Sequence, residues 1–336
     1  MTTSLSYRVF KGTDFGKMIP HDDIFRAWFG GIDFLYQLSR PKSSPIRLRI
    51  QTQLSSFHFL SHILPVNRYE IADKQDFSST LALALSTKGW VFCSVSQEDS
   101  TAQYRIDSFF RNSLVMNGER FRMTDFMSRW SRITLWHFET ESIRSPQHLT
   151  RLCLQTIAEN FANPQSGALR KLHKWRLLLR RSSMRNNWKT LLQDKGYYFD
   201  LATQLYQQLS GNHKGGNREK FVSCLSQSSL FLSQPSLAKA ARLYRQSAQQ
   251  WERLSEILIA SEHVPLKEAL HAIHVGNWPV EVQREQREAF VNGSGVLDIP
   301  FRLSVLNQTL ERIIQLEEQG AHIILQSVHQ AYEAAV

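Results

Sequence analysis

Short apolar runs bounded by turn residues occur through the first part of the chain, and they predict β-strands. Residues 90–95, Trp-Val-Phe-Cys-Ser-Val, are rich in β-forming side chains and predict a buried strand. Residues 132–138 predict a second strand. Asn117-Gly118 separates two further runs, residues 113–116 and 120–124, and this dipeptide in that setting predicts a tight β-hairpin.

The pattern changes from Ser145 onward, where apolar residues recur every three or four positions and predict helices. The longest such pattern follows Gln234-Pro235-Ser236 and consists of Leu237, Ala241, Tyr244, Ala248, Trp251, Leu254 and Leu258. Other helices are predicted to begin near Ser145, Ser166, Tyr197 and Arg218 and after Pro300. The sequence therefore predicts an α+β protein, with a strand-containing domain over residues 1–145 and a mostly helical domain over residues 146–336.

The composition is that of a globular protein. Of the 336 residues, 42% are hydrophobic and 21% are charged. No apolar run reaches the roughly 20 residues that a transmembrane helix needs, and the start of the chain lacks the pattern of a signal peptide. The three cysteines are far apart and odd in number, which argues against a disulfide scaffold and against a zinc ribbon. We therefore expect a cytoplasmic protein with no membrane partner, no bound metal and no cofactor.

Positive charge is concentrated in residues 165–190, which contain eight basic residues and no acid. Subtracting these eight from the 40 Lys and Arg leaves 32, against 30 Asp and Glu, so the net charge of +10 is largely local. On a helix, one face would carry Arg170, Lys174, Arg181 and Arg185, and the opposite face Leu172, Trp175 and Leu179. A solvated face is the usual explanation for charges, but this excess favours docking of an acidic partner. No recognised nucleic-acid-binding motif accompanies the stretch, which argues against nucleic acid.

A glycine-rich loop, residues 211–217, precedes the helix predicted from Arg218. Glycines at a helix start leave backbone N–H groups and the positive end of the helix dipole free to bind a phosphate. The alternative is a turn between helices that needs glycine only for its backbone angles. On the first interpretation, the residues that bind a carrier protein or a phosphate are Lys214, Gly215, Gly216, Asn217 and Arg218.

The cysteines and histidines give weak indications of chemistry. Cys93 and Cys153 lie within apolar runs and predict small buried side chains. Cys224 falls about two turns into a predicted helix, beyond the first turn where a helix dipole mainly acts; a nucleophilic role stays open as an alternative, with His213 nearby in sequence. Two sets have spacings seen at metal sites but lack further ligands, namely His58 with His62 and Glu268 with His271 and His274.

Several motifs point to a known family. The second half reads Ser166-Gly-Ala-Leu-x-x-Leu172-x-x-Trp175, then Gly211-x-x-x-Gly215-Gly216-Asn217-Arg218-x-x-Phe221-x-x-x-Leu225, then Tyr244-x-x-x-Ala248-x-x-Trp251-x-x-Leu254. The first half contributes residues 29–36 (Phe-Gly-Gly-Ile-Asp-Phe-Leu-Tyr), 88–92, 114–118 and 122–125. Together these motifs, spread over most of the chain, resemble the butirosin biosynthesis H protein (BtrH) family of acyltransferases.

The resemblance implies a papain-like N-terminal domain that moves an acyl group from an acyl carrier protein onto an amine. The family uses a cysteine near the chain start and a histidine on a later strand, because the thiolate attacks and the imidazole generates it. This chain departs from the family at both points: no cysteine precedes Cys93, and residues 110–113 read Phe-Arg-Asn-Ser where the histidine is expected. The acidic position matches Asp125, which without its histidine is expected to bond backbone amides or Arg122. The resemblance thus implies a degenerate papain-like domain with a dismantled catalytic site.

The favoured hypothesis is a non-catalytic relative of acyl-carrier-protein-dependent acyltransferases. It would have an accessory or binding role in specialised-metabolite biosynthesis, with an acidic carrier protein or a catalytic family member as its partner. One alternative is an active acyltransferase or amide-bond-forming enzyme that uses other residues, with Cys224 as nucleophile. The other alternative is a nucleic-acid-binding protein that uses the basic stretch 165–190.

Overall fold

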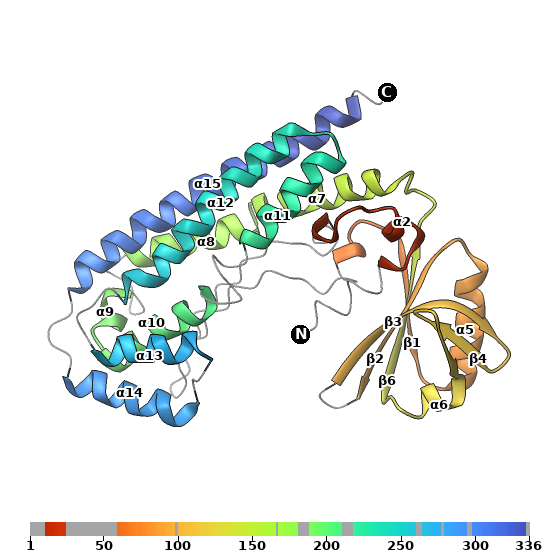
Figure 1. Ribbon diagram of the computed structural model, residues 1–336, viewed down its shortest axis with the longest axis horizontal. Coiled ribbons are helices and arrows are strands. Elements are labelled where there is room, and N and C mark those ends of the chain that lie inside the picture. The colour runs from red at the N-terminus through yellow and green to blue at the C-terminus, as the bar shows by residue number, and fades with distance from the viewer. Residues whose placement is uncertain are drawn as a thin grey trace. The chain divides into compact units, whose positions relative to one another are not determined.

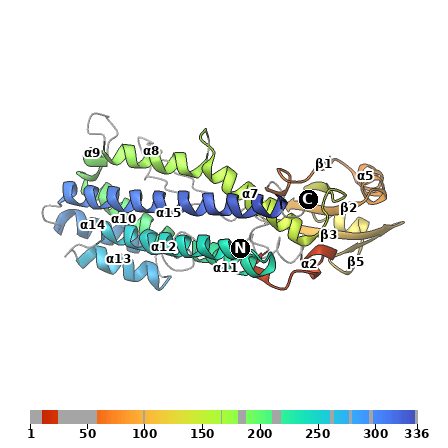
Figure 2. The ribbon, with the colours of Figure 1, turned by 90° about the horizontal axis from the view of Figure 1, so that it is seen from above.

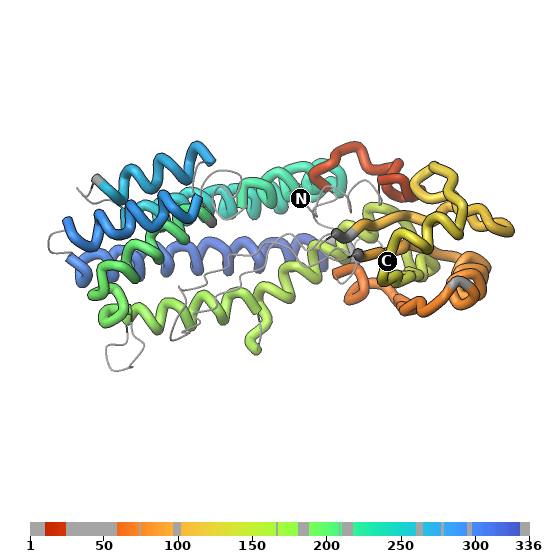
Figure 3. Tube along the Cα trace, turned by 90° about the horizontal axis from the view of Figure 1, so that it is seen from below, coloured from red at the N-terminus to blue at the C-terminus, as the bar shows by residue number. Residues whose placement is uncertain are grey.

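The computed structural model describes residues 11–24, 59–97, 100–165, 167–180, 188–209, 218–259, 264–276, 279–293 and 298–333. The chain divides into two compact units between Cys153 and Leu154, inside helix α7 (Pro146–Ala162). The domain boundary predicted after residue 145 lies at the start of this helix. The first unit contains a six-stranded sheet and the second is helical (Figures 1 and 3), which confirms the α+β class.

The sheet of the first unit is antiparallel throughout, with the strand order β1-β6-β2-β3-β4-β5. Its strands are β1 (Val66–Ile71), β2 (Gly89–Gln97), β3 (Ser100–Phe110), β4 (Ser113–Met116), β5 (Glu119–Arg122) and β6 (Arg132–Glu139). Besides the start of α7, the described helices of this unit are α2 (Asp14–Lys17), the 3-10 helix η1 (Asp22–Ile24), α5 (Lys74–Ser86) and α6 (Met123–Met127). Strands β2 and β6 contain the two runs from which strands were predicted.

The turn between β4 and β5 confirms the predicted hairpin. Asn117 and Gly118 have φ angles of 53° and 83°, both in the left-handed region. Two consecutive residues of this kind make a two-residue turn whose twist matches that of the flanking strands.

The core of the first unit lies between one face of the sheet and helices α5 and α6. Because side chains alternate along a strand, Val91, Cys93 and Val95 of β2 all point to this face. They pack with residues of the helices and of the other strands, namely Phe77, Leu81, Ala84, Ile106, Leu114, Met116, Met123, Phe126, Ile133 and Leu135. On the opposite face, Phe92 and Phe138 pack against each other with ring centroids 5.9 Å apart.

The second unit is built around two long helices, α12 and α15, which pack along each other (Figure 2). Helix α11 packs on α12, and α8 packs on α15. The bounds are α8 (Ala168–Arg180), α9 (Trp188–Leu192), α10 (Lys195–Leu209), α11 (Arg218–Phe231), α12 (Pro235–Ile257), α13 (Val264–His274), α14 (Val280–Gly293) and α15 (Ile299–Glu333). All seven apolar positions predicted for the long helix, Leu237 to Leu258, are buried.

Several predicted features fall outside the described residues. They are the motif at residues 29–36, the glycine-rich loop 211–217 with Lys214, Gly215, Gly216 and Asn217, and the residues His58, Arg181, Arg185 and His213. Among the residues that are described, no helix is both long and apolar enough to span a bilayer.

Candidate functional site

Helix α8 is amphipathic and contains the first half of the basic stretch. Three of its apolar residues, Leu172, Trp175 and Leu179, are buried, as predicted. Arg170 and Lys174 are exposed, also as predicted, and so is Arg180 at the last position of the helix. We call Arg170, Lys174 and Arg180 the α8 basic face.

Among the described residues, three of the five Lys and Arg residues of α8 have no acidic partner. Arg176 is half-buried and pairs with Glu311 of α15 at 2.6 Å. Arg170 donates a hydrogen bond to the carbonyl oxygen of Gln165. In the described part of the chain, no carboxylate lies in ion-pair range of Arg170, Lys174 or Arg180. The α8 basic face is therefore available to an external anion or acidic protein.

The prediction that Arg218 binds a carrier protein or a phosphate is corrected by its position, because its side chain lies in the core of the helical unit. The residue is 0% exposed. Its Nε donates to Oε1 of Glu317 at 2.8 Å and its Nη2 donates to Oε2 at 3.1 Å. The guanidinium carbon also lies 5.0 Å from the centroid of the Trp251 ring. Arg218 is thus part of a buried ion pair and is not presented to a phosphate at the glycine-rich loop.

Glu317 is the centre of a larger buried polar network. Its Oε1 accepts hydrogen bonds from Ser247 Oγ at 2.6 Å and from Trp251 Nε1 at 2.9 Å, in addition to the one from Arg218. Its backbone carbonyl accepts one from the Tyr244 hydroxyl at 3.3 Å. We call Arg218, Tyr244, Ser247, Trp251 and Glu317 the buried polar network, which ties α11, α12 and α15 together.

The electrostatics of this network keep Tyr244 neutral. Burial, followed by the negative charge of Glu317, raises the pKa of the Tyr244 phenol, and Arg218 opposes this shift. A neutral phenol is the form that can donate to the Glu317 carbonyl. The network therefore holds one cation, one anion and neutral donors, which is the balance a buried polar cluster needs.

The described motif residues of the second half lie in and around this network. Trp175 stacks on Trp251 with ring centroids 6.2 Å apart and an interplanar angle of 20°. Phe221 meets Tyr244 edge to face at 5.0 Å. Leu172, Leu225, Ala248 and Leu254 are buried as well. These described motif residues therefore form part of the interior of the helical unit.

All three cysteines of the chain are buried, each with 0% exposure. This confirms the prediction for Cys93 and Cys153. Burial raises the pKa of the Cys93 thiol well above its usual range, which disfavours the thiolate. Cys224, the alternative nucleophile, lies inside α11 and is equally shielded from solvent.

Asp125 and the described candidate metal ligands are surface residues. Asp125 is exposed in α6 and accepts a hydrogen bond from Thr124 Oγ1 at 3.3 Å. The expected bonds to backbone amides or to Arg122 are not formed in the described part of the chain, since a short helix places the carboxylate toward solvent. The side chains of His62, Glu268, His271 and His274 are exposed. Within the residues described, no cluster of three or more metal-ligating side chains occurs.

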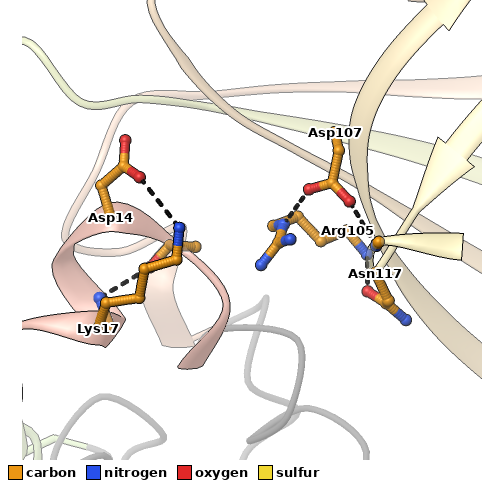
Figure 4. A network of polar contacts seen from close by, with 8 residues as sticks. Asp14, Lys17, Arg105, Asp107 and Asn117 are labelled. Carbon is orange, nitrogen blue, oxygen red and sulfur yellow. Dashed lines mark hydrogen bonds and ion pairs between the residues drawn. The ribbon is translucent and has the colours of Figure 1, made fainter.

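A second polar network, in the sheet unit, was not predicted from the sequence (Figure 4). Asp107 accepts hydrogen bonds from Arg105 Nε and from the backbone N–H of Gly118, the latter at 2.7 Å. Asn117 Oδ1 accepts from the Arg105 N–H at 2.9 Å. The Arg105 guanidinium lies so close to Gly12 that a Cβ on that residue would have no room. This network fixes the turn of the β4–β5 hairpin and the backbone beside α2.

The sequence did contain a sign of the buried polar network. Glu317 falls among the apolar positions of the last helix, seven residues after Leu310, four after Ile313 and seven before Ile324. An acid at such a position on an apolar stripe indicates a buried carboxylate that needs a partner. Which residue supplies that partner could not be deduced from spacing within the helix.

Comparison with protein-family models finds no match to this chain, and comparison with curated proteins finds no significant match.

Proposed function

We propose that this chain is a non-catalytic binding protein related to the BtrH-type acyltransferases, and that it docks an acidic acyl carrier protein. The observation that carries the proposal is the α8 basic face, with three exposed cations on a helix whose apolar side is packed into the core. Acyl carrier proteins are acidic, and a concentrated positive patch attracts such a partner and speeds association.

Two further observations support the non-catalytic part. All three thiols are buried, so none is placed for attack on a thioester. Residues 110–113, where the family's histidine is expected, form the tight connection between β3 and β4, with Arg111 at a φ of 54°. A papain-like origin for the sheet unit belongs to this proposal; what supports it is an antiparallel sheet with motif residues in β2, β4 and β5.

The test is binding of a purified holo acyl carrier protein encoded near this gene, measured by calorimetry or biolayer interferometry. Arg170→Glu/Lys174→Glu should weaken binding roughly tenfold or more, mainly through slower association, because the substitution reverses the steering field. The matched control is Arg242→Glu/Arg245→Glu on α12, an equal charge change at two exposed residues. The control should bind nearly as well as the parent protein.

Unchanged binding by Arg170→Glu/Lys174→Glu would reject the α8 basic face as the docking site. Equal losses in both double variants would show that only net charge matters, which also rejects a specific site on α8. Acyl transfer by the purified chain, measured in the same mixtures, would reject the non-catalytic part.

A further inference from the structure

Strands β3, β4 and β5 present a face of the sheet that the proposed function does not use. The strand register places Phe110 opposite Ser113 and Ser113 opposite Arg122, so these three form one row across β3, β4 and β5. Val115 opposite Arg120 belongs to the next row on the same face. The neighbouring residues Leu114, Met116 and Phe121 point the other way, toward the core.

This face combines one exposed aromatic ring with three arginines. Phe110 is 70% exposed, which is unusual for a phenylalanine. The guanidinium carbon of Arg111, in the turn after β3, lies 5.1 Å from the centroid of the Phe110 ring. Arg120 and Arg122 are exposed on β5, two residues apart and therefore roughly 7 Å from each other along the strand. We call Phe110, Arg111, Arg120 and Arg122 the hairpin face.

The described residues supply no counter-ion to the hairpin face. In the described part of the chain, no carboxylate lies in ion-pair range of Arg111, Arg120 or Arg122. The nearest acid in sequence, Glu119, alternates with Arg120 and points to the other side of β5. Asp107 is held by Arg105 and the Gly118 amide. All three arginines are exposed, and no described carboxylate compensates their charge.

The mixture of groups distinguishes among anionic partners. An acidic protein surface would be attracted by the arginines, but its carboxylates would gain little binding energy from the exposed phenyl ring of Phe110. Bases of single-stranded nucleic acid stack both on aromatic rings and on guanidinium planes, and their phosphates bind arginine side chains. In the β3–β4–β5 part of the sheet, one face packs on the core and the other carries exposed aromatic and basic residues, an arrangement that RNA-binding sheets use.

We propose that the hairpin face binds single-stranded nucleic acid, with a base stacked on the Phe110–Arg111 pair and adjacent phosphates held by Arg120 and Arg122. This surface is separate from the α8 basic face, and the inference does not depend on the carrier-protein proposal. Recognition is by stacking and charge, so it is tolerant of base sequence.

The test is fluorescence anisotropy with labelled homopolymeric oligo-U and oligo-dT and the full-length chain, at about 50 and 200 mM salt. Arg120→Glu/Arg122→Glu should lower affinity at least roughly tenfold and reduce the slope of log K against log salt by about 1.4, because each single-strand phosphate that the two arginines neutralise adds about 0.7 to that slope. Phe110→Ala should lower affinity about 5-fold or more with the slope unchanged, because it removes stacking and no charge. Phe110→Trp should bind as tightly as the parent protein. Phe110→Leu, which keeps an apolar side chain without a ring, should bind as weakly as Phe110→Ala.

Arg242→Glu/Arg245→Glu on α12 is the matched control for net charge and should bind like the parent protein. Arg170→Glu/Lys174→Glu should also retain binding, which separates the hairpin face from the α8 basic face. Full affinity in Phe110→Ala, or equal losses in the hairpin and α12 variants, would overturn the proposal. So would competition by poly-glutamate as strong as competition by unlabelled oligonucleotide, because that result identifies an acidic polypeptide as the ligand.

Discussion

The guanidinium of Arg218 and the carboxylate of Glu317 form a bidentate ion pair inside the helical unit, although they are 99 residues apart in the chain. Both side chains have 0% exposure. A pair taken fully out of water is stable only when its remaining hydrogen-bonding groups are satisfied, and Ser247 and Trp251 supply those bonds to Glu317. The pair therefore links the start of α11 to the middle of α15.

Glu317→Gln should lower the free energy of unfolding by about 3–5 kcal/mol, because it leaves the Arg218 cation buried without a counter-charge. The measurement is equilibrium unfolding in urea. Glu311→Gln on the same helix is the control: its pair with Arg176 is partly exposed, so the loss should stay below about 1 kcal/mol. Arg218→Met/Glu317→Met, which removes both charges, should lose less than the two single substitutions added together. A loss in Glu317→Gln no larger than that in Glu311→Gln would contradict this account.

Gly320 lies one turn beyond Glu317 on α15, where the helix meets the Tyr244 ring. A Cβ added at Gly320 would lie 2.7 Å from Cε2 of that ring. Gly320→Ala should therefore destabilise the protein by about 1–2 kcal/mol, since the clash outweighs the better helix propensity of alanine. Thermal unfolding measures the difference. Gly293→Ala, at a helix end with open space around it, should be neutral or slightly stabilising; a similar loss there would mean that the Tyr244 contact is not the cause.

The turn from α11 to α12 contains a serine in a conformation that suits glycine. Ser233 has a φ of 52°. Gln234 N–H donates to Ser229 O at 2.9 Å and Ser233 N–H donates to Leu230 O at 3.2 Å, which is the Schellman pattern of hydrogen bonds at a helix end. Ser233→Gly should raise the free energy of unfolding by up to about 1 kcal/mol by removing the strain of the left-handed backbone. Ser226→Gly, inside α11, should instead lower it by roughly 0.5 kcal/mol. Destabilisation by both would refute the argument.

The burial of the cysteines predicts their reactivity. In the native protein, none of Cys93, Cys153 and Cys224 should react with Ellman's reagent over minutes, and all three should react after unfolding in denaturant. If one thiol reacts at once in the native protein, Cys224→Ser identifies whether it is the thiol of α11. Rapid native reaction that disappears in that variant would reopen the acyltransferase alternative.

Much of the fold could be predicted because its signals are local. The β4–β5 turn is encoded by Asn117-Gly118, and the start of α12 by a proline next to an apolar stripe. Strand β3 was missed because a bulge between Ile106 and Ser108 inserts Asp107 and interrupts the alternation of apolar and polar residues. The bulge is also what places the Asp107 carboxylate on the hairpin turn, so the missed strand and the missed network have one cause.

The surroundings of Arg218 were harder to predict, because the residues next to it in sequence are not the ones that bind its side chain. Arg218 follows a glycine-rich loop, which pointed to a phosphate. Its helical phase pointed inward instead: it shares the buried stripe of α11 with Phe221, Val222 and Leu225, three, four and seven residues on. The acid that makes this burial possible lies on the last helix, and no local pattern connects the two. By contrast, the exposure of Arg170 and Lys174 follows from the periodicity of α8 alone.

His137 of β6 gives the sheet unit a specific sensitivity to acid. The residue is 2% exposed, and its Nε2 lies 3.1 Å from Thr87 Oγ1. Thr87 donates its only hydroxyl proton to Ala84 O, so His137 is assigned as the Nε2–H tautomer that donates to Thr87. Burial lowers the pKa of the imidazole, and the nearby charge of Glu139 opposes that shift.

Since the folded state holds this proton less tightly than the unfolded chain, the unfolded chain binds more protons as the pH falls. Stability is then fully present above the unfolded pKa of about 6.5 and declines as the pH falls below it. His137→Gln keeps a donor for Thr87 and cannot titrate. Between about pH 8 and about pH 5.5, the free energy of unfolding in urea should therefore fall less in this variant than in the parent protein.

The pKa of His148 is lowered as well, by burial and by Arg144 and Arg151, but it titrates in both proteins and its contribution cancels in the difference. His62→Gln, the same substitution at an exposed residue, is the control for the chemical change. Identical acid sensitivity in His137→Gln and the parent would contradict this account, because it would mean that His137 binds its proton equally well in the folded and unfolded states.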